Sequence, residues 1–169
     1  MEIALTLLII AAAAFAIRTI IKTNPAQPMA LPPMPARPYQ PALPEGPAAL
    51  HWSDDGRYLV EVVTESRYLP ALKELAGEHG DQAAAASYLA TLVPDDANPY
   101  ESAAVAVFLA GRMVGYLSPK ASVAFREHLK RKEVEGQITT CDAQVRGGGK
   151  WQNGRLAYVV VLDMEPLER

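Results

Sequence analysis

Few side chains in this sequence have the types and spacing that enzymatic or metal chemistry requires. Its three histidines, His51, His79 and His128, are far apart and lack the spacing of metal ligands. The single cysteine, Cys141, excludes both a cysteine metal cluster and a disulfide within the chain. No nucleophile lies in a G-x-S-x-G turn, and no phosphate loop of the Walker type occurs. We therefore expect neither an enzyme nor a bound metal or cofactor.

Two short segments only partly resemble binding motifs. Residues 147–150 have the sequence Gly-Gly-Gly-Lys, but Trp151 follows the lysine where a phosphate loop has Ser or Thr. A flexible hairpin turn is therefore the favoured interpretation. Asp95 and Asp96 could bind a hard cation, yet two neighbouring acids before a loop are usually solvated.

One local cluster of positive charge stands out near the end of a predicted helix. Its members at helical spacing are Arg126, Lys130, Arg131 and Lys132. We favour a solvated helix face, where positive charge near the C-terminus complements the helix dipole. The alternative is a surface that contacts phosphate or acidic lipid.

Net charge argues against a protein that coats nucleic acid. The chain carries 16 basic and 19 acidic side chains, a net charge of −3. Residues 1–50 hold three of the basic and two of the acidic ones, so residues 51–169 carry 13 against 17, a net charge of −4. Broad phosphate binding normally needs a basic surface, because it is driven by the release of counterions. A small pocket for one nucleotide or strand end remains compatible with this charge.

The N-terminus predicts a membrane anchor over residues 1–23. Residues 3–17 contain no charge, and residues 3–21 would form a helix about 28 Å long, close to the roughly 30 Å of a bilayer core. The positive charges Arg18 and Lys22 come after the uncharged run 3–17, which favours a cytoplasmic C-terminal side and a single-pass protein of the inner membrane. A cleaved signal peptide, or a buried or oligomerising helix, are the alternatives.

Residues 24–50 predict a linker, and residues 51–169 a single folded domain. Nine of the 14 prolines fall between positions 25 and 47, in a stretch too poor in apolar periodicity to build a core. Extended, these 27 residues would span up to roughly 80 Å. A spacer is favoured over a ligand for proline-recognising domains.

Alternation of apolar residues and turn signals predict a β-dominated α+β domain with two short helices. Ala110-Gly111 predicts a tight hairpin, and Ser118-Pro119 a capped helix start. A glycine-rich turn at 147–149 joins the last two strands. Such an order suggests a small curled sheet or barrel. The strands are predicted at 57–64, 88–93, 103–109, 112–117, 137–145 and 156–164, and the helices at 70–76 and 120–132.

The most informative segment is residues 92–117, LVPDDANPYESAAVAVFLAGRMVGYL. It resembles the HIRAN domain, a small β-rich module found in many bacterial proteins. The pattern of that family is close to L-x-x-E/D-P-x-N-P-Y-D-x-N-A-I/V-x-V, followed by G-x-x-V-G-Y/H-L and a helix. The match is good over residues 92–129 and extends more weakly to Arg67-Tyr68 and the closing strands. The resemblance implies an OB-like barrel.

The resemblance also implies a ligand, the 3′ end of single-stranded DNA. In that family an aromatic pair sandwiches the terminal base, and an acidic residue bonds the free 3′ hydroxyl. By position, Tyr68 and Tyr100 would form the pair, Glu101 would meet the hydroxyl and Arg67 would lie near a phosphate. The remaining members of the implied nucleic-acid site are Asn98, Tyr116 and Lys120.

Three departures from the family pattern bear on this expectation. Glu101 replaces the usual Asp, Ala103 replaces an Asn that could brace the turn, and Leu69 replaces a common second aromatic residue. We therefore weigh two functions for a membrane-anchored, non-catalytic module. One is recognition of a nucleic-acid end. The other is a protein-interaction or scaffold domain that keeps the HIRAN fold without binding DNA.

Overall fold

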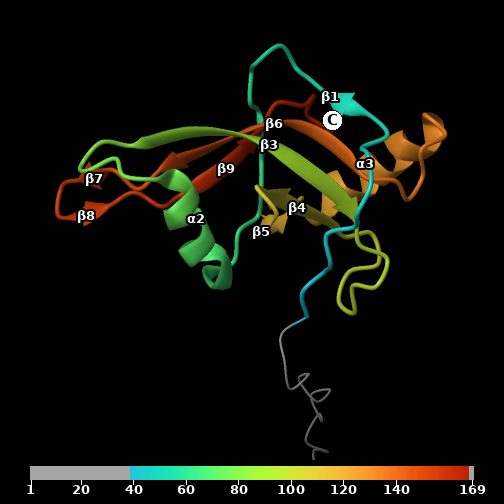
Figure 1. The fold of residues 1–169 in the computed structure, drawn as a ribbon, viewed down its shortest axis with the longest axis horizontal. Coiled ribbons are helices and arrows are strands. Elements are labelled where there is room, and N and C mark those ends of the chain that lie inside the picture. The colour runs from blue at the N-terminus through green and yellow to red at the C-terminus, as the bar shows by residue number, and fades with distance from the viewer. Residues whose placement is uncertain (1–38, 168–169) are drawn as a thin grey trace, which may run out of the picture. The chain divides into compact units, whose positions relative to one another are not determined.

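The computed structural model describes residues 39–167 (Figure 1). The predicted membrane anchor, and the predicted linker up to residue 38, lie outside the described residues. None of the helices within the described range has the length and apolar character that crossing a bilayer requires. Residues 39–167 belong to one compact unit, in which residues 39–50 precede the first strand and Ala49 and Leu50 bond beside the start of β6.

The described chain is dominated by strands, with two α-helices and one turn of 3₁₀-helix. The helical elements are η1 (Ser66–Tyr68), α2 (Leu69–Ala76) and α3 (Pro119–Arg131). The strands are β1 (His51–Trp52), β2 (Val60–Glu61), β3 (Ala84–Pro94), β4 (Val105–Leu109), β5 (Arg112–Tyr116), β6 (Thr139–Gly147), β7 (Lys150–Trp151), β8 (Gly154–Arg155) and β9 (Val159–Leu162). The predicted β-dominated α+β class with two short helices is confirmed.

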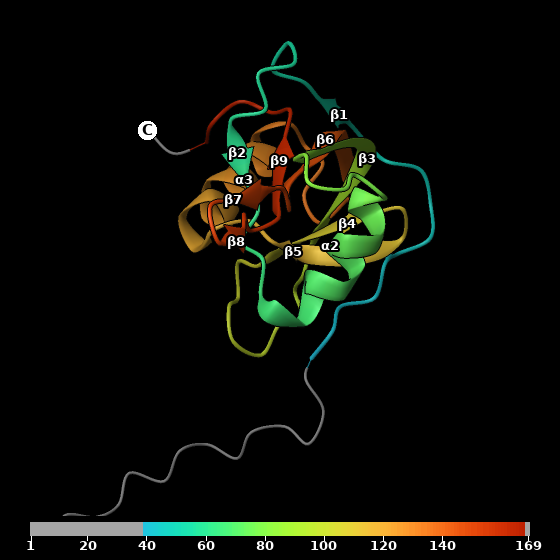
Figure 2. The same ribbon diagram turned by 90° about the vertical axis from the view of Figure 1, so that its left-hand side faces the viewer.

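Six strands form a curled antiparallel sheet in the order β2-β9-β6-β3-β4-β5, and β1 pairs in parallel with β6 (Figure 2). The segment that follows the outer strand β2 bonds both β9 and the other outer strand, β5. The Val62 N–H donates to the Val160 carbonyl oxygen at 2.9 Å, and Val63 exchanges two backbone hydrogen bonds with Tyr116 at 2.8 and 3.0 Å. The sheet therefore curls far enough for one segment to touch both ends, a geometry compatible with a small barrel.

This closure depends on a glycine in β5. A Cβ atom built at Gly115 would lie 2.3 Å from the Val63 carbonyl oxygen and 2.8 Å from Val62 Cγ1. Any larger residue would leave no room for the incoming backbone. This close approach explains why a glycine occupies position 115 in the Val-Gly-Tyr-Leu motif.

The helices cover the sheet as their apolar faces predict. Phe125 and Leu129 of α3, and Leu72 of α2, are almost fully buried in the main core. Ser118 caps α3, since its Oγ accepts a hydrogen bond from the Ala121 N–H at 3.2 Å, and a proline occupies the first turn. The predicted start of this helix is confirmed.

Two predicted strands are much shorter than expected. The strand predicted at 57–64 is reduced to β2, because Asp55 and Tyr58 adopt left-handed backbone angles (φ of 52° and 51°) and delay the start of the ladder. The strand predicted at 156–164 is reduced to β9.

The glycine-rich turn predicted at 147–149 is also wrong as a simple connection. An additional hairpin, β7–β8, lies between β6 and β9, and Trp151 at its tip is largely exposed. Its backbone closes where the Leu156 N–H donates to Gly149 and the Gly148 N–H donates to Leu156. The hairpin projects from the end of the sheet opposite the loop 95–104 (Figure 1).

Candidate functional site

The loop 95–104, which joins β3 to β4, is shaped by the side chain of Asn98. Its Oδ1 accepts the backbone N–H groups of Tyr100 at 3.0 Å and Glu101 at 3.1 Å, and its amide donates to Asp95 at 3.2 Å. An asparagine that bonds backbone two and three residues ahead fixes a tight turn. Here the turn holds Tyr100 outward, with 71% of that residue exposed.

An arginine of α3 holds the same loop from the other side. Arg126 donates from Nε to the Ala103 carbonyl at 2.9 Å, from Nη2 to the Ala104 carbonyl at 2.8 Å and from Nη1 to Asp96 at 2.5 Å. The interpretation of the basic cluster as a solvated face is therefore wrong for Arg126. Its three nitrogens are engaged in bracing the loop.

A cavity of about 210 Å³ lies between this loop, β5, the start of α3 and the η1 turn. Its wall is mainly apolar, and the volume is below the ~300–1,000 Å³ of most small-molecule sites. Five of the seven residues implied by the family resemblance line it: Arg67, Asn98, Tyr100, Glu101 and Tyr116. These residues come from three separate stretches of sequence, so the fold gathers them.

Tyr68 lies elsewhere. It is only 6% exposed and packs with Phe108 and Met113 in a second apolar cluster, and it is not among the residues that line the cavity. Burial raises the pKa of the Tyr68 phenol, whose oxygen is buried without a hydrogen-bond partner. Tyr100 thus presents an accessible ring to the cavity, whereas Tyr68 is part of its supporting core.

Lys120 also lies outside the lining. It is an exposed residue in the first turn of α3, while Pro119 and Ser122 of the same helix do line the cavity. The structure therefore places Lys120 next to the rim and not in the wall.

The single cation of the lining residues is already engaged. Arg67 binds both carboxylate oxygens of Glu65, through Nε and Nη2 at 3.1 Å each, and donates from Nη1 to the Tyr39 carbonyl at 2.9 Å. The guanidinium also lies 4.7 Å from the centre of the Tyr68 ring. Glu101 accepts the Ala103 N–H at 3.2 Å. With two glutamates and one arginine, the wall has a net negative charge.

Directly behind this wall lies Asp95, which is 5% exposed. Its carboxylate accepts the Tyr39 phenol at 2.6 Å and the Asn98 amide at 3.2 Å, with the Tyr116 phenol at 3.4 Å. The prediction that Asp95 is solvated is wrong, because β3 delivers it to the interior where three side chains satisfy it. Asp96 does face solvent.

The two phenols on Asp95 are held in the protonated state. The hydrogen bond to Asp95 is the main reason that the pKa of Tyr39 rises to about 12, and burial and the negative charge of Asp95 add to it. Burial, followed by the proximity of Tyr68 and Asp95, raises the pKa of Tyr116 far above its usual value. Both tyrosines therefore act as hydrogen-bond donors at neutral pH.

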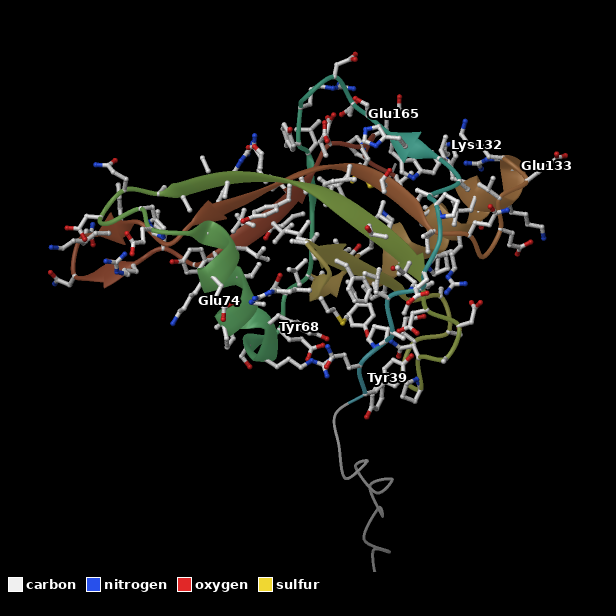
Figure 3. All side chains as sticks on the ribbon, in the orientation of Figure 1. Tyr39, Tyr68, Glu74, Lys132, Glu133 and Glu165 are labelled. Atoms are coloured by element: carbon white, nitrogen blue, oxygen red, sulfur yellow. The ribbon has the colours of Figure 1, made fainter. Side chains whose placement is uncertain are left out.

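Sequence reasoning missed Tyr39, Glu65 and Asp95 as parts of this site. Tyr39 falls within the predicted linker, and its contact with Asp95 spans 56 residues of chain. A signal for Asp95 was present, since it belongs to the same Asp-Asp-Ala-Asn-Pro-Tyr run as Asn98 and Tyr100. Figure 3 shows Tyr39 where the described chain begins, with Tyr68 at the foot of α2.

The described residues contain no group of three or more His, Cys, Asp or Glu side chains placed to hold a metal ion. Comparison of the chain with models of protein families, with curated proteins and with solved structures found no match. The geometry of the cavity therefore carries the functional argument.

Proposed function

We propose that this chain is a membrane-anchored, non-catalytic HIRAN-like module with an OB-like barrel, and that its cavity binds the 3′ end of single-stranded DNA. The observation that carries the proposal is the gathering of Arg67, Asn98, Tyr100, Glu101 and Tyr116 around one cavity. The anchor over residues 3–21 would hold the domain on the cytoplasmic side of the inner membrane.

Each group in the cavity has a role that suits a strand end. The exposed ring of Tyr100 offers a stacking surface, and stacking of one base on an aromatic ring contributes about 1–3 kcal/mol. A carboxylate accepts a hydrogen bond from a hydroxyl group, which Glu101 can do at the rim. Arg67 would approach a phosphate, but only by loosening its pairing with Glu65.

The negative charge of the domain limits how much of a strand it holds. A wall with one cation cannot neutralise a run of phosphates, so contact with a single terminal nucleotide is the form of binding that this surface supports. The affinity should then depend weakly on salt and strongly on the chemistry of the strand end.

The test is a titration of the full chain in detergent micelles, followed by fluorescence anisotropy. The probes are two 5′-labelled single-stranded oligonucleotides, one with a free 3′ hydroxyl and one with a 3′ phosphate. We expect the free end to bind more tightly, and Tyr100→Ala to weaken binding about tenfold through the lost stacking. Trp151→Ala removes another largely exposed ring, on the β7–β8 hairpin, and serves as the control.

The proposal fails if neither oligonucleotide changes the anisotropy at low salt. A second candidate is then favoured, a protein-interaction or scaffold domain at the membrane. The observation that supports it is the mainly apolar wall, whose one cation, Arg67, already pairs with Glu65. The start of α3 lies at the cavity, and the region around Lys132, where the helix ends, is a second place where such a partner would dock (Figure 3).

A further inference from the structure

Residues 39–50 form a strap that runs from the cavity to the first strand. At its far end the Ala49 N–H donates to the Ile138 carbonyl at 2.9 Å, and the Thr140 N–H donates to the Leu50 carbonyl at 2.9 Å. At its near end Tyr39 enters the cavity wall. The strap is thus attached to the sheet at one end and to the cavity at the other.

Tyr39 is held in the wall by two polar contacts, one at each end of the residue. Its phenol donates to Asp95 at 2.6 Å, and its backbone carbonyl accepts from Arg67 Nη1 at 2.9 Å. A charge-assisted bond this short is among the stronger contacts of a protein surface. Tyr39 therefore binds the buried carboxylate of Asp95 and the guanidinium of Arg67 at the same time.

These contacts have the same chemistry that a terminal nucleotide would offer. Tyr39 presents a flat aromatic ring, a hydroxyl donor to a carboxylate and an oxygen acceptor to an arginine. A nucleotide with a free hydroxyl presents a flat base, a hydroxyl donor and phosphate oxygens. The free protein thus contains an internal group that fills these positions.

We propose that Tyr39 is an internal competitor for the cavity, and that a ligand binds by replacing its phenol on Asp95 and its carbonyl on Arg67. This inference rests on the proposed function, and it assigns the buried Asp95 as the acceptor of the ligand hydroxyl in addition to Glu101 at the rim. Since Asp95 lies behind Tyr39, the carboxylate becomes reachable from the cavity when that ring moves away.

The burial of Asp95 makes the exchange selective. A buried carboxylate that loses a donor is strongly destabilised unless another donor takes its place. A strand end with a free hydroxyl supplies that donor, whereas a terminal phosphate supplies more negative charge. The Asn98 and Tyr116 donors stay in place and keep the carboxylate oriented.

The experiment compares the full chain with Tyr39→Phe, which keeps the ring and removes only the hydroxyl. With the free-hydroxyl oligonucleotide described above, we expect Tyr39→Phe to bind about five- to tenfold more tightly, because Asp95 then has an unused acceptor. The 3′-phosphate oligonucleotide should gain nothing. Tyr58→Phe, a tyrosine outside the cavity lining, is the control and should bind like the unchanged chain.

A second measurement follows the strap itself. Hydrogen exchange of peptides within residues 40–50 should become faster when the free-hydroxyl oligonucleotide binds the unchanged chain, because Tyr39 has left the wall. Oligonucleotide binding with unchanged affinity in Tyr39→Phe and unchanged exchange in the strap overturns this inference and leaves the proposed function standing. Absence of binding in the unchanged chain, Tyr39→Phe and Tyr39→Ala overturns both.

Discussion

Two buried aspartates hold neighbouring segments of this domain, and each directly follows a strand. Asp163 follows β9 and accepts the Ser53 hydroxyl at 2.9 Å and the backbone N–H groups of Asp54 and Gly56 at 3.2 and 2.9 Å. Asp95 follows β3 and accepts only side-chain donors, from Tyr39, Asn98 and Tyr116. Their exposed fractions are nearly the same, 3% and 5%. The two carboxylates differ in the kind of hydrogen-bond donor that they accept.

Backbone donors and side-chain donors give a carboxylate different degrees of freedom. Amides of a folded loop cannot leave Asp163 unless the loop 53–57 opens. The phenol of Tyr39 can leave Asp95 when the start of the strap moves, without the opening of a folded loop. We therefore interpret Asp163 as a structural group, and Asp95 as the exchangeable one that serves the cavity. Four predictions test this contrast.

The largest effect is expected for Asp163→Ala. It removes the acceptor for two backbone amides and a hydroxyl, which should lower the free energy of unfolding by about 3 kcal/mol in a urea titration. Asp163→Asn keeps one acceptor oxygen and should lose less. A loss below about 1 kcal/mol for the alanine variant would show that the loop holds without its carboxylate.

The carboxylate of Asp163 should also make the stability of the domain depend on pH. Burial would raise the pKa of Asp163, but the bonds from Ser53 and from the amides of Asp54 and Gly56, with the nearby Arg57 amide, outweigh it, so the pKa is lowered from its ordinary 3.8. Its stabilisation is therefore complete above the ordinary value and is lost as the pH falls through the lowered one. The stability gap between the unchanged chain and Asp163→Asn should narrow in acid.

A smaller effect is expected at alkaline pH for the exchangeable site. The pKa of Tyr39 is raised from 10.0 to about 12 in the folded state, so its bond to Asp95 persists at pH 10 and is lost as the pH rises through 12. An absorbance titration of tyrosinate should show one tyrosine fewer titrating near pH 12 in Tyr39→Phe. In Asp95→Asn the Tyr39 phenol should titrate closer to pH 10. A Tyr39 phenol that still titrates near pH 12 in Asp95→Asn would contradict the assigned bond.

The smallest effect is expected for Asn98→Ala. The side chain makes three hydrogen bonds, but they lie in a solvent-facing loop that Arg126 also braces. We expect a loss of about 1 kcal/mol in unfolding free energy. Binding of the free-hydroxyl oligonucleotide should weaken more clearly, since Tyr100 loses its orientation. Asn153→Ala, in the turn of the β7–β8 hairpin, is the matched control and should leave that binding unchanged.

Features set by local chemistry were predictable from the sequence. The Ser118-Pro119 start of α3 and the hairpin at Ala110-Gly111 follow from residues within a few positions of each other. The cavity loop was also located, because Asn98-Pro99-Tyr100 carries its own turn chemistry.

Features set by distant partners were not predictable. Tyr39 belongs to a proline-rich stretch whose composition indicates an extended spacer, and its contacts with Asp95 and Arg67 draw it to the domain. The burial of Tyr68 depends on Phe108 and Met113, which belong to β4 and β5 and are distant from Tyr68 in the sequence. For Arg126 a signal did exist, since it lies one turn after Ser122 on the helix face that is buried.

The closure of the sheet has a consequence for how molecules of this protein meet. Outer strands with unpaired backbone groups are templates for pairing with another chain, and natural sheets protect them. Here one segment, through Val62 and Val63, continues the outer strand β2 along β9 and also pairs with the other outer strand, β5, and Gly115 makes the approach possible. A side chain at Gly115 would push that segment away and free two edges together. Self-association would then accompany the loss of stability, which makes this glycine a safeguard against aggregation.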